Sequence, residues 1–116
     1  MAIGDARREQ VFPTLTALQI AMARRFASDA PRRFAPREVV YEIGARDAAC
    51  WLMLDGSADA IRRGAAGQSS LVTTYGPGQF TGETNQLSGR PALMTVVAGE
   101  AGAVAIPFDA PHLRAL

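Results

Sequence analysis

The sequence predicts an all-β domain, an antiparallel roll of short strands that follows one N-terminal helix. Three observations support this fold class. Helical spacing of apolar residues is confined to residues 15–26, short β-type segments recur from residue 32 onward, and glycine, proline and aspartate separate those segments at regular intervals. Many short strands with regular turn signals are typical of an antiparallel roll. A chain of 116 residues fits one domain with a single modest core.

The N-terminal helix is preceded by a polar segment, residues 1–10, which we expect to be a flexible arm; the folded domain then spans residues 11–116. Thr16 is predicted to cap the helix, because Gln19 three residues later completes a capping box. Leu15 and Ile20 are spaced as a hydrophobic staple across that cap. Residues 28–31 are predicted to end the helix. The residues that recur at helical spacing, and that we expect to face the core, are Leu15, Leu18, Met22 and Phe26.

The first strands are predicted around Phe34, over residues 39–43 and over residues 50–54. Asp55 and Gly56 are then expected to form a turn, after which residues 57–63 continue as a strand. Residues 64–67 form a glycine-bounded tip before a strand over residues 70–75.

The C-terminal part is predicted to hold a hairpin and a short helix. The hairpin pairs residues 92–98 with residues 102–106 about Gly99. Asp109 is a suitable cap for a final helix. The sequence stops in the second turn of that helix.

Composition excludes several classes of function. Twelve basic residues, all arginine, oppose eleven acidic ones, and the arginine pairs are scattered, so no basic stripe for nucleic acid is predicted. Cys50 is the only cysteine and His112 the only histidine, which leaves neither a disulfide nor a zinc pattern nor a convergent catalytic set. Without a signal peptide or an apolar run of about 18 residues, a cytoplasmic location with no membrane contact is expected.

The most informative segment is residues 75–95, where glycines at 76, 78, 82 and 89 lie between two predicted strands. Glycine permits positive φ and lets backbone amides approach a ligand. Residues 83–87 can form one helical turn, whose free N–H groups and dipole favour an anion. An ordinary glycine-rich connection between strands is the alternative interpretation.

This segment resembles the phosphate-binding cassette of the cyclic-nucleotide-binding domain family. The family pattern Gly-x-Phe-x-Gly-Glu appears here as residues 78–83, and its Pro-Arg-Ala-Ala-Thr appears as Pro-Ala-Leu-Met-Thr over residues 91–95. Residues 33–44 and 51–60 look like the family's second and third strands. The resemblance runs from about Val11 to the C-terminus and implies an antiparallel double-stranded β-helix, or jelly roll, with a short cassette helix and a truncated C-terminal helix.

The resemblance also implies a ligand site. In the family, the glutamate at the position of Glu83 accepts hydrogen bonds from the ribose 2′-hydroxyl, and amides of the cassette helix meet the cyclic phosphate. Phe80 would anchor the loop in the core. The alternative for Glu83 is an acid that the dipole favours at a helix N-terminus. The implied ligand-binding residues are Gly82, Glu83, Thr84, Asn85, Arg90, Ala92 and Leu93.

Two departures from the family pattern weaken the expected binding of cAMP or cGMP. The phosphate-binding arginine of the family is replaced by Ala92. Arg90 lies two residues earlier, about 6.6 Å along an extended strand on the same face, so it either compensates or points to solvent. The family closes its pocket with a helix after the roll, whereas this chain stops at Leu116; it is either a fragment or lacks that lid.

A finer resemblance concerns residues 75–83 and 87–92, which look like the version of the domain ahead of FAD-dependent thioredoxin-reductase-like proteins. It implies a regulatory module for a fused or partner oxidoreductase, although neither a Gly-x-Gly-x-x-Gly fingerprint nor a Cys-x-x-Cys is in this chain. The chain itself is therefore expected to be neither an enzyme nor a cofactor carrier. A docking or dimerisation domain of the same fold, without nucleotide affinity, remains the alternative, and a homodimer is compatible with either reading.

Overall fold

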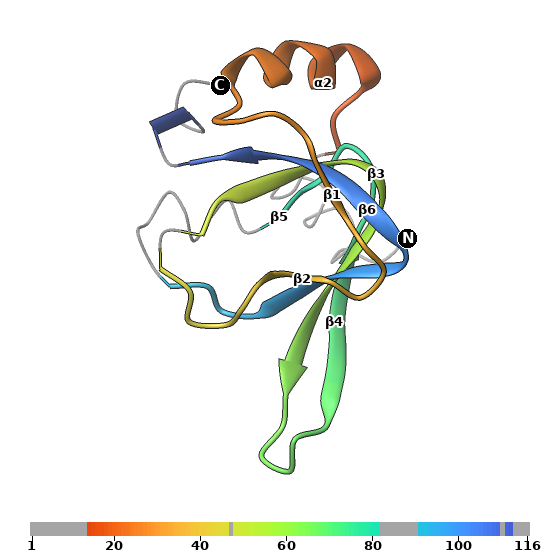
Figure 1. The fold of residues 1–116 in the computed structure, drawn as a ribbon, viewed down its shortest axis with the longest axis vertical. Helices are drawn as coiled ribbons and strands as arrows, with labels where there is room; N and C mark the ends of the chain where they lie inside the picture. Colours follow the sequence, from red (N-terminus) through yellow and green to blue (C-terminus); the bar gives the residue numbers. More distant parts are fainter. Residues whose placement is uncertain (1–13, 47, 82–90, 110, 113–116) are drawn as a thin grey trace, which may run out of the picture.

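The computed structural model describes residues 14–46, 48–81, 91–109 and 111–112. Its strands form an antiparallel sheet that curls into a roll, with one short helix at one end and a β-hairpin projecting at the other (Figure 1). In chain order the elements are α2 (Ala17–Ala23), the 3₁₀ turn η1 (Arg24–Phe26), β1 (Arg32–Phe34), β2 (Val39–Tyr41), β3 (Cys50–Arg63), β4 (Ser69–Tyr75), β5 (Phe80–Thr81) and β6 (Thr95–Phe108). This confirms the predicted fold class.

Two long strands, β3 and β6, organise the roll. They pair antiparallel from Cys50 opposite Phe108 to Ile61 opposite Thr95. The strand order is β1-β6-β3-β4, while β2 also pairs with β6 and β5 with β3. Each long strand therefore has different partners along its length, which is how a few strands enclose an interior.

Glycine bulges let these two strands bend. Gly56 and Gly102 adopt φ of +72° and +79°, and the β3–β6 register shifts on both sides of Gly56. The predicted turn at Asp55-Gly56 was therefore wrong, because this glycine makes a bulge within one strand. The predicted hairpin about Gly99 was also wrong, since Thr95–Phe108 is a single strand that pairs with β3 on both sides of residues 99–102.

Successive side chains of β3 point to opposite faces of the sheet, and this separates two apolar clusters. Trp51 and Met53 face the interior of the roll, where Phe34 packs edge-on against Trp51 with ring centroids 5.1 Å apart. Cys50 and Leu52 face the other side and pack with Phe108. The predicted burial of Cys50 is confirmed, since its exposed fraction is 0%.

The capping box of α2 is present as predicted. The Thr16 hydroxyl accepts from the Gln19 amide at 3.2 Å, and the Gln19 side chain accepts from the Thr16 amide at 2.8 Å. Leu15 and Ile20, the expected staple, both pack against the second apolar cluster.

The predicted core face of α2 was wrong at three of its four positions. Leu18, Met22 and Phe26 are 71%, 58% and 41% exposed. Ile20 and Ala23 instead pack on the sheet, together with Ala27, and these three also recur at helical spacing. Because the helix has two apolar stripes, helical spacing alone does not decide which of them faces the sheet. The stripe that contains the small alanines lets the helix approach the sheet more closely.

Candidate functional site

The turn that leads into the cassette is held by the main chain of β3. The Gly78 amide donates to Met53 O at 2.8 Å, and the Met53 amide donates to Gln79 O at 2.9 Å. The Gly76 amide donates to Gln79 Oε1 at 2.7 Å. The expectation that amides of these two glycines approach a ligand was wrong, because both are already bonded within the protein.

Gly78 has a structural reason to be glycine. Its φ is +86°, and a Cβ there would lie 2.6 Å from Leu15 O. The Leu15 amide in turn donates to Gly78 O at 2.8 Å. The segment that enters α2 is thus bonded to the turn that enters the cassette.

Phe80 and Thr81 fasten the start of the cassette to the core. Phe80 packs edge-on against Phe108, with ring centroids 5.6 Å apart, which confirms the predicted anchor. Thr81 is fully buried, and its hydroxyl accepts from the Trp51 amide at 3.3 Å. This hydroxyl was not singled out in the sequence; a threonine beside the conspicuous glycine gave no signal of its own.

The implied ligand residues Gly82, Glu83, Thr84, Asn85 and Arg90 lie outside the described residues, so their roles remain predictions. The structure does define what holds the two ends of that segment. The start is fixed by Phe80 and Thr81, and the return of the chain is fixed by residues 91–95.

The returning chain is pinned to the loop after β2. The Ala92 amide donates to Ala45 O at 3.0 Å, and the Gly44 amide donates to Ala92 O at 2.7 Å. Thr95 is 1% exposed, and its hydroxyl accepts from the Ile43 amide at 3.0 Å. The two ends of the cassette are therefore each held by a buried threonine hydroxyl and by main-chain bonds.

Ala92 and Leu93 lie in opposite environments. Ala92 is 7% exposed, whereas Leu93 is 60% exposed. The structure thus brings only Ala92 of the implied ligand residues that it describes into the protein interior, and that residue offers a methyl group and no charge. Next to it, Met94 packs against the interior cluster that contains Trp51.

The described residues also line a groove of about 370 Å³ elsewhere on the roll. Its walls are residues 33–36, Glu38, Asp55, Gly56 and residues 101–104. Neither Ala92 nor Leu93, the two implied ligand residues that the structure describes, belongs to it. The groove follows the bends of β3 and β6 at their glycine bulges, which explains it without a ligand.

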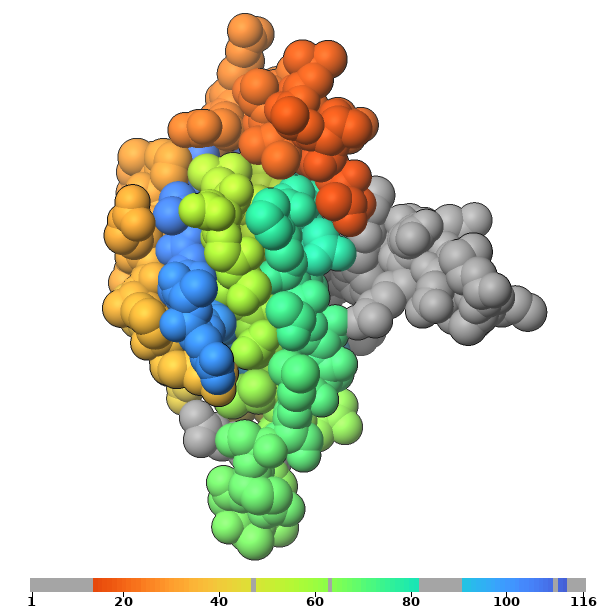
Figure 2. Space-filling view, turned by 90° about the vertical axis from the view of Figure 1, so that its right-hand side faces the viewer, coloured from red at the N-terminus to blue at the C-terminus, as the bar shows by residue number. Residues whose placement is uncertain are grey.

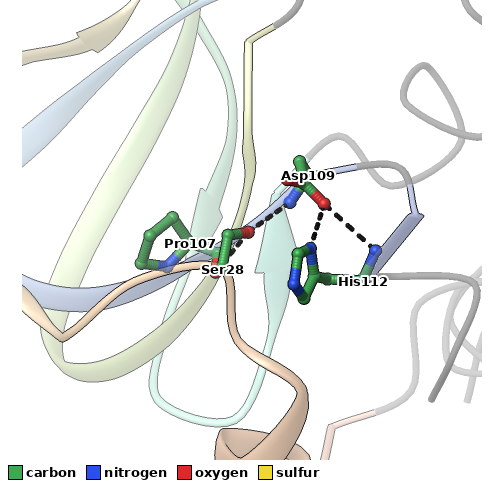
Figure 3. Close-up of polar contacts among 4 residues, drawn as sticks. All are labelled: Ser28, Pro107, Asp109 and His112. Carbon is green, nitrogen blue, oxygen red and sulfur yellow. Dashed lines mark hydrogen bonds and ion pairs between the residues drawn. The ribbon is translucent and has the colours of Figure 1, made fainter.

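The chain leaves the roll through a polar cluster drawn in Figure 3. The Ser28 hydroxyl donates to Pro107 O at 3.2 Å and accepts from the Asp109 amide at 2.6 Å. The Asp109 carboxylate accepts from the His112 amide at 3.0 Å, which confirms its predicted role as a cap, and also contacts the His112 ring. These bonds to His112 lower the pKa of Asp109.

Within the described part of the chain, no three histidine, cysteine, aspartate or glutamate side chains gather closely enough to hold a metal ion. The helices of this part are also too short to span a membrane.

A family model for the cyclic nucleotide-binding domain matches residues 31–116, well over half of the chain. No curated protein sequence matches the chain.

Solved structures with the same fold come from several organisms. The catabolite activator protein of Thermus thermophilus is 19% identical, with a TM-score of 0.72 over 87% of this chain and 46% of its own. The N-terminal domain of a transcriptional regulator from Streptomyces coelicolor is 17% identical, with a TM-score of 0.70 over 87% of this chain and 68% of its own. A regulatory subunit of a cAMP-independent protein kinase A from Trypanosoma cruzi, bound to guanosine, is 21% identical, with a TM-score of 0.64 over 74% and 30%. The chain thus spans less than half of the Thermus protein.

Proposed function

The chain belongs to the cyclic nucleotide-binding domain family, and on that premise we propose that it is a regulatory module that binds a nucleotide-type ligand at the cassette after Phe80. The observation that carries the proposal is the anchoring of both cassette ends. Phe80 and Thr81 fix the entry, while Ala92 and Thr95 fix the return. Anchored ends of this kind are what an anion site between them requires, because the main-chain donors of such a site must be held in place.

We propose further that a cyclic phosphate binds weakly, because Ala92 takes the place of the family's arginine. A charge-assisted hydrogen bond contributes about 1.5–3 kcal/mol. Its loss corresponds to a roughly ten- to hundredfold weaker affinity. The buried methyl group of Ala92 supports this reading, since no cation occupies its position in the interior.

Arg90 is the candidate for partial compensation, and Glu83 for the ribose contact. Both roles are carried over from the family pattern. If Arg90 reaches the phosphate, removing it should weaken binding by a similar ten- to hundredfold factor, because the same kind of bond is lost.

A ligand without the cyclic phosphate is a further reading of the Ala92 position. The Trypanosoma cruzi subunit has the same fold, is described as cAMP-independent and is bound to guanosine. A site that lacks the phosphate-binding cation loses less binding free energy with a nucleoside than with a cyclic nucleotide. The nucleoside carries no phosphate, so no desolvated negative charge is left without its partner. Guanosine therefore belongs in the ligand panel beside cAMP and cGMP.

The test is calorimetric titration of the wild type and of Ala92→Arg with cAMP, cGMP and guanosine. Ala92→Arg should strengthen cyclic-nucleotide binding by about ten- to hundredfold and leave guanosine unchanged. Leu93→Arg is the matched control, because it adds the same charge at the neighbouring exposed residue. Equal gains in the two variants would mean that a general charge effect is at work and that Ala92 does not face a phosphate.

A docking or dimerisation domain of the same fold is the second candidate. It is favoured by the exposed apolar side chains on α2, Leu18 and Met22, and by the missing cation at residue 92. If neither the wild type nor Ala92→Arg releases or absorbs heat of binding at millimolar ligand, the docking or dimerisation function is favoured. Sedimentation of the same samples would then reveal whether the chain forms a dimer.

The output is proposed to be an oxidoreductase of the FAD-dependent thioredoxin-reductase-like type, fused to this chain or acting as its partner. Only the pattern of residues 75–83 and 87–92 supports this output. Sequencing the gene beyond the codon for Leu116 tests it. A flavoprotein region would support the proposal, and a helix-turn-helix region would replace it with transcriptional control.

A further inference from the structure

A β-hairpin projects from the roll at the end opposite α2. We name residues 60–73 the arm; it consists of the distal parts of β3 and β4 with the connection between them. Its base, Ala60 and Ile61, still pairs with β6, and beyond this base both views show the arm standing away from the body (Figures 1 and 2). Leu71 is 64% exposed and Val72 is 45% exposed. Leu71 lies opposite Ile61, whereas Val72 falls at the register shift. The arm therefore presents two aliphatic side chains to solvent, one paired and one at the register shift.

The arm is also positively charged. Between Ala60 and Thr73 the sequence holds two arginines and no acidic residue. Arg62 is exposed there. The nearest acid along β3 is Asp59 at the base of the arm, and it is already bonded to Arg37 and Thr74.

One edge of the arm is unprotected. β4 ends the strand order, and among the described strands its only neighbour is β3. Exposed edge strands are usually guarded by charge, proline or brevity, because they pair readily with another chain. Residues 69–72, Ser-Ser-Leu-Val, are all exposed and contain neither a charge nor a proline; the register shift at Val72 is the one interruption of this edge.

A strained arginine links the base of the arm to the body. Arg37 has φ of +65°, unusual for a residue with a Cβ. Its amide donates to Ala98 O and Gly99 O, and its guanidinium contacts Asp59 at 3.3 Å and Glu100 at 3.9 Å. Asp59 is also bonded to Thr74 of β4 at 2.9 Å. Since strain of this kind persists where the surroundings over-determine it, the base of the arm is tied to the body.

We propose that the arm is a docking element, and that its occupant is an extended segment of a partner protein with alternating acidic and aliphatic residues, which adds along the open edge of β4. The acids would face Arg62, and the aliphatic residues, on the opposite face of the added strand, would cover Leu71. This assignment does not depend on a nucleotide ligand.

Other occupants fit less well. A second copy would bring two positively charged arms together, which is unfavourable. Nucleic acid would satisfy the arginines but leave the aliphatic side chains without a role. A membrane-inserting tip would need large apolar residues at residues 64–68, which read Gly-Ala-Ala-Gly-Gln.

The test is an NMR titration of the full ¹⁵N-labelled chain with a synthetic heptapeptide, acetyl-Glu-Val-Glu-Val-Glu-Val-Glu-amide, up to about 1 mM. Saturable shifts should be confined to residues 60–75. The matching Lys-Val peptide should bind at least about tenfold more weakly, because the charges then repel.

Variants decide which features of the arm bind. Arg62→Glu should weaken binding about five- to tenfold, whereas Arg46→Glu, an equal charge change at an exposed residue off the arm, should not. Leu71→Ser should weaken it about tenfold or more, and Leu18→Ser, at a similarly exposed residue of α2, should leave it unchanged.

Arg37→Gly keeps the backbone conformation but removes both ion pairs. It should weaken binding while leaving the peptide's contacts the same, as expected of a positioning residue.

Several results would overturn the proposal. They are the absence of shifts in the arm at 1 mM peptide, equal binding of the lysine peptide, and binding that Leu71→Ser does not reduce. Tighter binding of phosphatidylserine vesicles or duplex DNA through the arm would assign it to a different partner. Self-association that disappears in Leu71→Ser would assign it to a second copy.

Discussion

The bend that closes the roll depends on two glycines that face each other across β3 and β6, and Gly56→Ala tests that dependence. Gly56 has φ of +72°, and a Cβ there would lie 2.2 Å from Gly102 O and 3.0 Å from Ala103 Cα. Real Cβ atoms do not approach backbone so closely, so the paired strands would have to separate locally.

The magnitude follows from two contributions. The left-handed conformation alone costs an alanine about 1–2 kcal/mol. Gly44 and Gly67 measure this contribution by themselves, since their φ values are +83° and +85° and a Cβ at either would meet nothing within 4 Å. The backbone clash should raise the loss for Gly56→Ala by at least a further ~2 kcal/mol, in the range of overpacked cores.

Urea denaturation followed by circular dichroism measures the difference, with the slope m as a check on two-state unfolding. Gly56→Ala should lower the unfolding free energy well below that of Gly44→Ala and Gly67→Ala. If all three variants lose the same stability within about 0.5 kcal/mol, the crossing of β3 and β6 does not require glycine and the reasoning is refuted.

Three smaller predictions concern single side chains. Thr95→Val should destabilise the domain by about 1–2 kcal/mol in the same assay, because the part-buried Ile43 amide loses its acceptor; an unchanged midpoint would contradict this. Hydrogen bonds with His112 hold the folded pKa of Asp109 below its ordinary value, so the contribution of Asp109 to stability is present above that ordinary value and disappears as the pH falls through the folded pKa. The stability of Asp109→Asn should therefore depend less on pH in acid than the wild type, and parallel pH profiles would refute the assignment. Cys50, fully buried, should react with a thiol reagent only after denaturant is added, and rapid labelling of the folded chain would show that the second apolar cluster opens.

The sequence by itself determined the fold class, the family pattern and the helix caps. Capping rules predicted the structure correctly where the two interacting residues are close in sequence. Thr16 and Gln19 lie three residues apart and cap a helix whatever surrounds it, and Asp109 caps the next helix in the same way. The resemblance to the family implied that Phe80 anchors the loop, and Phe80 packs on Phe108.

The tertiary structure decided everything that depends on which long-range partner is present. An Asp-Gly pair reads as a turn in a sequence, but at Gly56 the pairing of β3 with β6 continues on both sides and the glycine becomes a bulge. Helical spacing could not choose between the stripe of Leu18 and that of Ala23, since only the shape of the sheet beneath favours the smaller residue. Likewise Ala92 was known to lack a charge, yet its burial beside an exposed Leu93 follows from main-chain bonds to residues 44 and 45, contacts that no local pattern encodes.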